Sequence, residues 1–360
     1  MAITEAEIRN ALTAVQDPDL HRDIVSLGFV QDIAIQAGRV SFKIELTTPA
    51  CPVRDQMRDQ AAAIVRALPG VQDVAIQMTS QVRSSLGLSA QPMLPTVRNI
   101  VAIASGKGGV GKSTVSANLA LALSKTGARV GLMDADVYGP TIPIILGISH
   151  SAQVTAQEQI IPLEQHGLKV MSMGFFMKPD EAVVWRGPML HKTVQQFLGG
   201  VAWGELDYLL VDTPPGTGDV TLSLCQSIPL TGAVIVSTPQ DVALNVAQKA
   251  IAMFKKLNTP VLGIIENMGA YVCPHCGTRE EIFGSGGARQ TAQRLNLPFL
   301  GEIPLATPIR ETSDGGTPIV IAQPESSSAR AFTAVAEALA AQISIRAMSG
   351  ELAQPIKVTF

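Results

Sequence analysis

Apolar and polar positions follow two different patterns along the chain, and the pattern changes near residue 97. Before this point, short amphipathic segments predict a small α+β unit over residues 1–83. Its first helix has Ile8, Leu12 and Val15 on one face. The other predicted elements are strands at 30–35 and 40–46, a helix at 56–68 and a last strand at 71–78. Residues 84–96 mix Ser, Pro and Gly without a period, which predicts a linker.

From residue 97 onward, apolar runs alternate with helical segments. Continuous apolar runs are typical of strands that are covered on both faces. The predicted strands lie at 99–104, 129–133, 168–173, 207–211, 232–237, 260–266 and 298–303. This alternation predicts an α/β fold with a doubly wound, mostly parallel sheet over residues 97–347. A helix at 327–345 is predicted to pack on the sheet, and residues 348–360 form a C-terminal tail.

Composition narrows the class of protein. The chain has 360 residues, of which 46% are hydrophobic and 16% charged, so it can bury a large core. A net charge of −3 without runs of like charge gives no reason to expect nucleic-acid binding. There is no apolar run of about 18 residues and no signal-peptide pattern at the N-terminus. Four cysteines do not form a disulfide framework, so we expect a cytoplasmic protein with reduced thiols and no membrane partner.

Residues 106–113 form a glycine-rich loop between a predicted strand and a predicted helix. Gly106, Gly111, Lys112 and Ser113 fit the phosphate-loop pattern G-x-x-x-x-G-K-[ST]. Backbone N–H groups of such a loop and the N-terminus of the following helix bind phosphate oxygens. Lys112 is expected to reach the β- and γ-phosphates, and Ser113 to bind Mg²⁺. The predicted nucleotide-binding residues are Gly106, Lys107, Gly108, Gly109, Val110, Gly111, Lys112, Ser113, Thr114 and Asn267.

Three further strand ends carry polar residues that fit a nucleotide site. Asp212 ends an apolar strand, as a Walker B aspartate does, and is predicted to hold the Mg²⁺ shell. Asp134 and Asp136 alternate at the end of another strand, which predicts that both point toward the ligand crevice, where one positions or deprotonates the attacking water. Asn267 follows the strand at 260–266 and is predicted to contact a base edge, although asparagine at a strand end also fits ordinary turn chemistry.

Cys273 and Cys276 form a C-x-x-C pair in a loop beyond that strand. Two thiolates chelate one metal but leave a tetrahedral site incomplete, and the chain has no second such pair. A second copy of the chain, related by a two-fold axis, supplies the missing ligands most economically. A [4Fe–4S] cluster, a structural zinc and a redox disulfide all fit the pair. Cys51 is either a thiolate near a helix N-terminus or a buried small residue, and Cys225 is expected to be a core thiol.

Taken together, these motifs resemble a known family. Gly106-Lys107-Gly108-Gly109-Val110-Gly111-Lys112-Ser113 is similar to the deviant Walker A motif of the MinD/ParA, nitrogenase iron-protein and arsenite-pump ATPase class. With the segments 134–140 and 212–219 and the Cys-Pro-His-Cys loop, residues 97–345 closely resemble the Mrp/ApbC iron–sulfur cluster carriers. Residues 1–83 separately resemble SufT-like iron–sulfur assembly factors, through the segments 17–19, 23–28 and 48–52.

The resemblance implies a homodimer that sandwiches ATP. It implies that Lys107 reaches the partner's nucleotide, that Asp136 orients the water and that Asn267 contacts adenine, so the expected catalytic residues are Lys107, Lys112 and Asp136. It also implies that Cys273 and Cys276 of both subunits hold a bridging [4Fe–4S] cluster, received from cluster donors and passed to apo iron–sulfur proteins. The alternatives are a MinD/ParA-like positioning ATPase, which predicts a membrane-binding tail or a basic patch, and an ATPase with structural zinc at the dimer interface.

Overall fold

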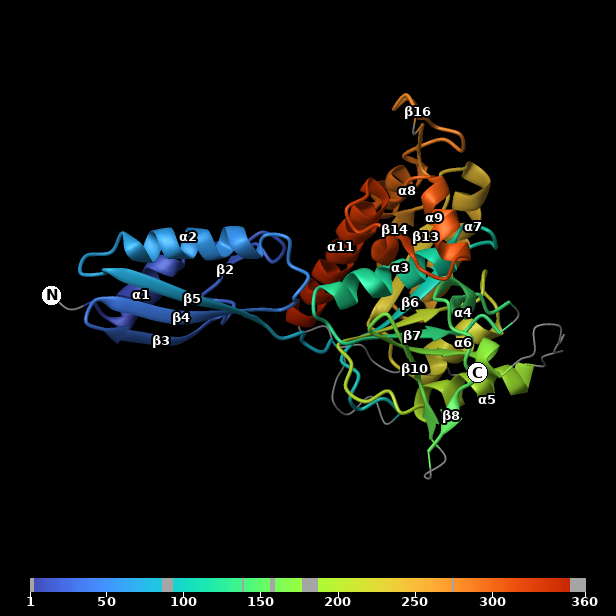
Figure 1. Cartoon of the computed structure of the whole chain (residues 1–360), viewed down its shortest axis with the longest axis horizontal. Helices are drawn as coiled ribbons and strands as arrows, with labels where there is room; N and C mark the ends of the chain where they lie inside the picture. Colours follow the sequence, from blue (N-terminus) through green and yellow to red (C-terminus); the bar gives the residue numbers. More distant parts are fainter. Residues whose placement is uncertain are drawn as a thin grey trace.

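The structure is a computed structural model that describes residues 3–85, 93–137, 139–155, 159–176, 187–273 and 275–349. These residues form two units, an N-terminal unit up to residue 85 and a C-terminal unit from residue 93 (Figure 1). Each unit has a hydrophobic core of its own. The α/β fold predicted from the sequence is confirmed, while the predicted domain boundaries stay predictions.

The N-terminal unit packs two helices on a three-stranded sheet. Its strand order is β3-β4-β5, with β3 and β4 antiparallel and β4 and β5 parallel. Buried and partly exposed residues alternate along β4, so one face of the sheet packs on the helices. The elements are α1 (Glu5–Leu12), β1 (Gln16–Asp17), β2 (Arg22–Asp23), β3 (Val30–Gln36), β4 (Arg39–Leu46), α2 (Arg54–Arg66) and β5 (Asp73–Ser80).

An eight-stranded sheet forms the centre of the C-terminal unit, in the order β10-β11-β7-β12-β6-β13-β14-β17. All neighbours are parallel except the pair β10 and β11 at one edge. The sheet strands are β6 (Ile100–Ser105), β7 (Val130–Asp134), β10 (Leu163–Gln165), β11 (Leu168–Ser172), β12 (Tyr208–Asp212), β13 (Gly232–Ser237), β14 (Val261–Glu266) and β17 (Phe299–Glu302). All seven predicted strands are present, and β10 was not predicted.

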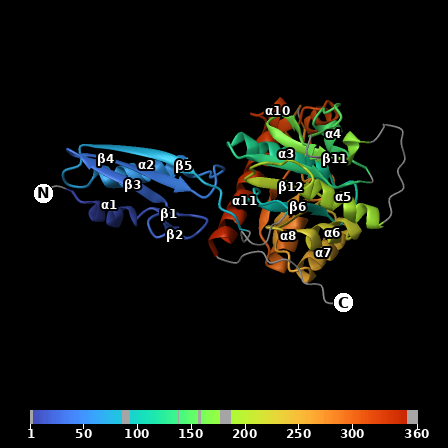
Figure 2. The same ribbon diagram turned by 90° about the horizontal axis from the view of Figure 1, so that it is seen from below.

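Helices cover both faces of this sheet, with α3, α10 and α11 on one face and α6, α7 and α8 on the other (Figure 2). The helices are α3 (Lys112–Lys125), α4 (Ile142–Ile145), α5 (Gly187–Gly199), α6 (Asp219–Ser227), α7 (Asp241–Lys256), α8 (Gly287–Leu295), α9 (Thr307–Asp314), α10 (Ile319–Ala322), α11 (Ser327–Ser349) and the 3₁₀ helix η1 (Met173–Phe175). Two short strand pairs complete the unit, β8 (Gln153–Val154) with β9 (Ile160–Ile161) and β15 (Tyr271–Val272) with β16 (Arg279–Glu280). None of the helices in the described residues is long and apolar enough to cross a membrane.

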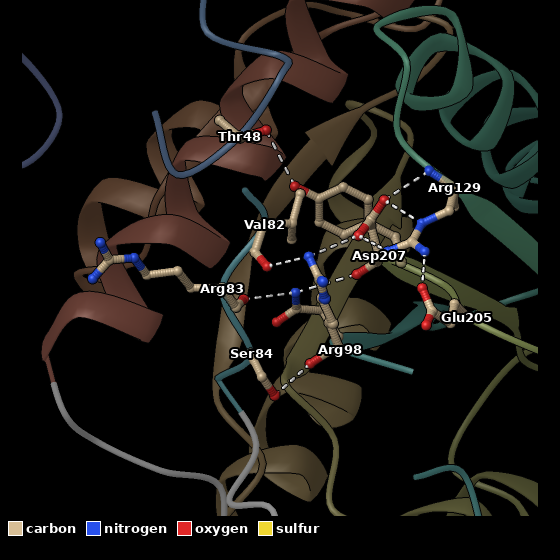
Figure 3. Close-up of polar contacts among 10 residues, drawn as sticks. Thr48, Val82, Arg83, Ser84, Arg98, Arg129, Glu205 and Asp207 are labelled. Carbon is tan, nitrogen blue, oxygen red and sulfur yellow. Dashed lines mark hydrogen bonds and ion pairs between the residues drawn. The ribbon is translucent and has the colours of Figure 1, made fainter. Parts of the chain in front are cut away.

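The N-terminal unit contacts the C-terminal unit along α11 and at the beginnings of β6 and β12 (Figure 1). The hydroxyl oxygens of Thr48 and Tyr208 lie 3.2 Å apart and are both buried. Arg98 donates to the backbone oxygen of Val82 and pairs with Asp207 (Figure 3). The segment that leaves β5 is therefore held against the sheet of the C-terminal unit. Most of the predicted linker, residues 86–92, lies outside the described residues.

Candidate functional site

The glycine loop connects the carboxyl end of β6 to the first residue of α3, as predicted. Gly109 and Gly111 both have φ near +78°, a backbone conformation that favours glycine. Gly106 lies against α7, where an added Cβ would be 2.5 Å from the backbone nitrogen of Ala247. Glycine is thus required for two different reasons, backbone conformation and close packing.

A cavity of about 410 Å³ opens over this loop. The predicted residues from Lys107 to Thr114 all line it, together with Asp136. Thr141 and Asp314 belong to its walls and were not singled out in the sequence, while Pro215 comes from the motif segment 212–219. The structure therefore brings the loop and one predicted catalytic carboxylate into a single crevice at the carboxyl ends of the strands, where α/β sheets bind ligands.

Asp212 is buried at the end of β12, beside β6, and is the centre of a compact polar cluster. Its Oδ2 accepts hydrogen bonds from Lys112 Nζ and from Ser113 Oγ, each at 2.7 Å. Its Oδ1 accepts one from Ser116, which the sequence did not single out. Lys112 is also buried, so the two charges compensate each other away from water.

Asp134 lies beside Asp212 in the sheet, because the two residues are register partners in β7 and β12. Burial, and next the negative charge of Asp212, raise the pKa of Asp134 to about 8. Ser172 Oγ donates to Asp134 at 2.9 Å, and the backbone N–H of Asp136 donates at 3.1 Å. Burial and the neighbouring Asp212 thus favour the neutral form of the Asp134 carboxyl.

The prediction that both aspartates of this strand face the crevice is wrong for Asp134. Asp136 lines the cavity, whereas Asp134 is fully buried and does not. The alternation rule fails here because β7 ends at Asp134, so the two-residue period of a strand does not extend to Asp136.

Asn267 is held against the phosphate loop. Its Nδ2 donates to the backbone oxygen of Val110 at 2.8 Å, and its side chain is buried. A Cβ on Gly111 would lie 2.3 Å from the same nitrogen. In this structure the amide braces the loop, and its predicted contact with adenine stays a prediction.

The two cysteines lie in the hairpin of β15 and β16, which projects from the C-terminal unit beyond α8 (Figure 1). Cys273 is half-buried and Cys276 is exposed. Cys276 Sγ and Thr278 Oγ1 are 3.1 Å apart, and this hydroxyl, followed by nearby backbone N–H groups, lowers the pKa of the Cys276 thiol. A thiol of this kind is prepared to bind metal as a thiolate.

No group of three or more His, Cys, Asp or Glu side chains that could hold a metal occurs among the described residues. The hairpin therefore offers its thiol pair without a third protein ligand from the described part of the same chain. Apolar side chains are exposed within the hairpin and just after it, at Val272, Ile282 and Phe283. Pro274, between the cysteines, lies outside the described residues.

The other two cysteines differ from this pair. Cys225 is buried and its pKa is raised to about 11, which confirms the predicted core thiol. Cys51 lines a small pocket between the N-terminal unit and α11, and burial raises its pKa. Cys51 is half-buried, and its raised pKa argues against the helix-activated thiolate.

The fold and this site define a P-loop NTPase: a glycine loop between strand and helix, with an aspartate at the end of the neighbouring strand that contacts the lysine and serine of the loop. Residues 96–340 match the family of the NUBPL iron-transfer P-loop NTPase, and the chain belongs to this family. Residues 5–78 separately match the iron–sulfur cluster assembly protein family. The family resemblance seen in the sequence is thereby confirmed for both units.

The most similar relatives include two of nearly the same length. An iron–sulfur cluster carrier protein of Deinococcus radiodurans is 50% identical, over 97% of this chain and 98% of the relative. An iron–sulfur cluster carrier protein of Synechocystis is 47% identical, over 96% of this chain and 99% of the relative. The iron–sulfur cluster transfer protein NUBPL of Dictyostelium discoideum is 47% identical, over 69% and 78%.

Solved structures resemble the C-terminal unit. A nucleotide-binding protein from Archaeoglobus fulgidus, in complex with ADP, is 43% identical with a TM-score of 0.56, over 62% of this chain and 88% of that one. The cell division ATPase MinD of Pyrococcus furiosus is 25% identical with a TM-score of 0.51, over 67% and 97%.

Proposed function

We propose that this protein binds and hydrolyses ATP and carries a [4Fe–4S] cluster, which it assembles between two copies of the chain and transfers to apoproteins. The observation that carries the proposal is the hairpin thiol pair: two cysteines, one with a lowered pKa, without a third ligand among the described residues of their own chain. A two-fold axis through such a hairpin gives four thiolates, the number that a [4Fe–4S] cluster requires. The names of the relatives support the same role.

The nucleotide site fits Mg²⁺ and a triphosphate. Lys112 and Asp212 neutralise each other in the structure. When the nucleotide binds, Lys112 would exchange its carboxylate partner for the β- and γ-phosphates, and Asp212 and Ser113 would hold Mg²⁺. Lys112 would then offset part of the phosphate charge, and a bound Mg²⁺ would supply further positive charge beside Asp212.

Hydrolysis requires a positioned water and stabilisation of the charge on the phosphoryl group that is transferred to it. Asp136 lines the cavity and is the residue proposed to orient the water. Lys107, also in the lining, is proposed to act on the nucleotide of the facing copy. Asn267 is proposed to reach adenine after it leaves Val110. Cluster donors and apo iron–sulfur proteins are the proposed partners, in the cytoplasm, without nucleic acid or membrane.

Anaerobic purification with iron, sulfide and zinc analysis tests the proposal. The wild type is expected to hold about four iron and four sulfide per dimer, with broad visible absorbance. Cys273→Ala and Cys276→Ala should each lose iron and sulfide together, because two ligands of the shared site disappear per dimer. Cys225→Ala, which removes a buried thiol away from the hairpin, is the matched control.

The alternatives give different results in the same experiment. A colourless protein with stoichiometric zinc that Cys273→Ala abolishes would show a structural zinc. A metal-free protein with full ATPase activity would favour a positioning ATPase. Iron and sulfide retained by both cysteine variants would refute the hairpin as the cluster site.

A further inference from the structure

Two glutamates at the ends of neighbouring strands hold the base of the cysteine hairpin. Glu266 ends β14 and Glu302 ends β17, and the two are register partners. Glu302 Oε1 accepts hydrogen bonds from the backbone N–H of Ala270 at 3.1 Å and from the guanidinium of Arg279 at 3.2 Å. Ala270 precedes β15 and Arg279 lies in β16, so a single carboxylate oxygen joins both strands of the hairpin.

Glu266 holds the other end of the same segment. Its two carboxylate oxygens accept from the backbone N–H groups of Gly286 and Ala288, at 2.8 and 2.7 Å. These groups belong to the N-terminus of α8, where a negative charge is favourable. The hairpin is therefore held at both ends, by Glu302 at its two strands and by Glu266 where the chain enters α8.

The chain that joins Glu266 to the hairpin also touches the phosphate loop. Asn267 donates to the Val110 oxygen, and a Cβ on Gly111 would lie 3.3 Å from Met268 Cε. Met268 has φ +56°, which is unusual for a residue other than glycine. A Cβ on Gly269 would lie 2.4 Å from Glu302 Oε1. Residues 267–269 are thus packed between the phosphate loop on one side and Glu302 on the other.

We propose that Glu302 is a positioning residue that transmits the nucleotide state of the phosphate loop to Cys273 and Cys276. When phosphates draw in the backbone of the loop, the contacts of Val110 and Gly111 with residues 267 and 268 change. Gly269 lies close to the Glu302 side chain, since a Cβ added there would be 2.4 Å from Glu302 Oε1, so a shift of Gly269 toward Glu302 displaces that side chain. Glu302 then displaces Arg279, whose strand partner Val272 directly precedes Cys273.

The inference rests on the proposed function only in that a nucleotide occupies the phosphate loop. Couplings between sites commonly change an affinity about 5- to 150-fold. The pair of Glu302 and Arg279 is partly exposed, with side-chain exposures of 28% and 54%. Solvent weakens such a pair, so we expect an effect at the lower end, about fivefold.

The test measures alkylation of Cys273 and Cys276 by iodoacetamide in the metal-free full-length protein, read out peptide by peptide. In the wild type, Mg²⁺ with a non-hydrolysable ATP analogue should change the alkylation rate about fivefold. In Glu302→Gln the remaining oxygen still accepts from Ala270, but the ion pair with Arg279 is lost. Its nucleotide effect should fall below about twofold, while ATP affinity and hydrolysis remain those of the wild type.

Two further variants separate positioning from simple loosening of the hairpin. Glu281→Gln removes an exposed charge from the same segment and should keep the fivefold response. Arg279→Lys keeps the positive charge facing Glu302 and should retain most of the fivefold response to nucleotide. If the two sites are coupled, alkylation of both thiols should also change the affinity for the ATP analogue in the wild type, and not in Glu302→Gln.

The proposal is overturned if Glu302→Gln responds to nucleotide as the wild type does, or if the wild type shows no response. Light scattering of each sample ensures that the compared proteins have the same oligomeric state. Since no iron is present, the outcome is independent of the cluster: a protein that fails to hold iron but shows the coupled thiol response refutes the proposed function and leaves this inference standing.

Discussion

At the scale of single residues, the site is organised by neighbouring carboxylates with different protonation states. Asp212 is paired with Lys112, and Asp134 beside it has a pKa near 8 because burial and the charge of Asp212 disfavour its ionisation. The sequence identified Asp212, Lys112 and Ser113 through motif spacing alone. It did not reveal the state of Asp134, because burial and a charge from another strand arise only on folding.

Asp134→Asn tests this protonation state. Wild-type Asp134 keeps its proton in the folded state up to about pH 8, while the unfolded chain loses it near the usual value of 3.8. The folded state then binds more protons than the unfolded state, so the free energy of unfolding falls as pH rises through this window. Asp134→Asn removes this slope. Urea unfolding without nucleotide measures this. As pH rises from about 5 to about 8, the free energy of unfolding of the variant should increase by at least about 1 kcal/mol relative to that of the wild type.

Asp136→Asn provides the comparison for Asp134→Asn, since Asp136 lines the cavity and no buried carboxyl is removed. The free energy of unfolding of Asp136→Asn, relative to the wild type, should change little with pH. Parallel pH profiles for wild type and Asp134→Asn would mean that Asp134 is ionised throughout.

At the scale of elements, hydrophobic runs and loop chemistry predicted seven strands of the large sheet and the junction of strand, loop and helix. They missed β10, whose three residues are too short to show a pattern. They also missed Glu266 and Glu302, because these residues act on backbone N–H groups of distant segments. Strand-end acidic residues were predicted to be functional where a known motif, as at Asp212, or a pair of carboxylates, as at Asp134 and Asp136, drew attention to them.

Packing of the glycine loop on α7 gives a prediction at this scale. In Gly106→Ala, the new Cβ would lie 2.5 Å from the backbone of Val246 and Ala247, which cannot rotate away. We expect thermal or urea unfolding to show a loss of about 1–3 kcal/mol. Gly108→Ala is the matched control, since its nearest neighbour would be 4.0 Å away, and its stability should stay within about 0.5 kcal/mol of the wild type. Equal losses in both variants would refute the packing argument.

At the scale of the whole molecule, two units of different families contact each other along β12 and α11. Tyr208 begins β12 next to Thr48, and Asp212 ends the same strand at the nucleotide site. Sequence patterns separated the units but did not predict this contact, because a buried hydroxyl pair between distant segments leaves no periodic signal. Thr48 lies close to Cys51 in the chain, and both residues line the pocket against α11.

Tyr208→Phe tests whether the hydroxyl pair holds the two units together. The change removes one buried partner and leaves Thr48 Oγ1 without the Tyr208 hydroxyl, which costs about 1 kcal/mol of docking free energy. Opening of the interface exposes Cys51, whose thiol is held at a raised pKa by burial. Under native conditions, alkylation of Cys51 should therefore accelerate about fivefold. Thr48→Val should have at least this effect, because it removes the same interaction and also the acceptor of the Ala50 backbone N–H at 3.1 Å. The double variant should add little to Thr48→Val. Tyr271→Phe, in the hairpin, should leave the Cys51 rate unchanged. An unaltered Cys51 rate in Tyr208→Phe would show that the apolar contacts of α11 hold the units without this hydrogen bond.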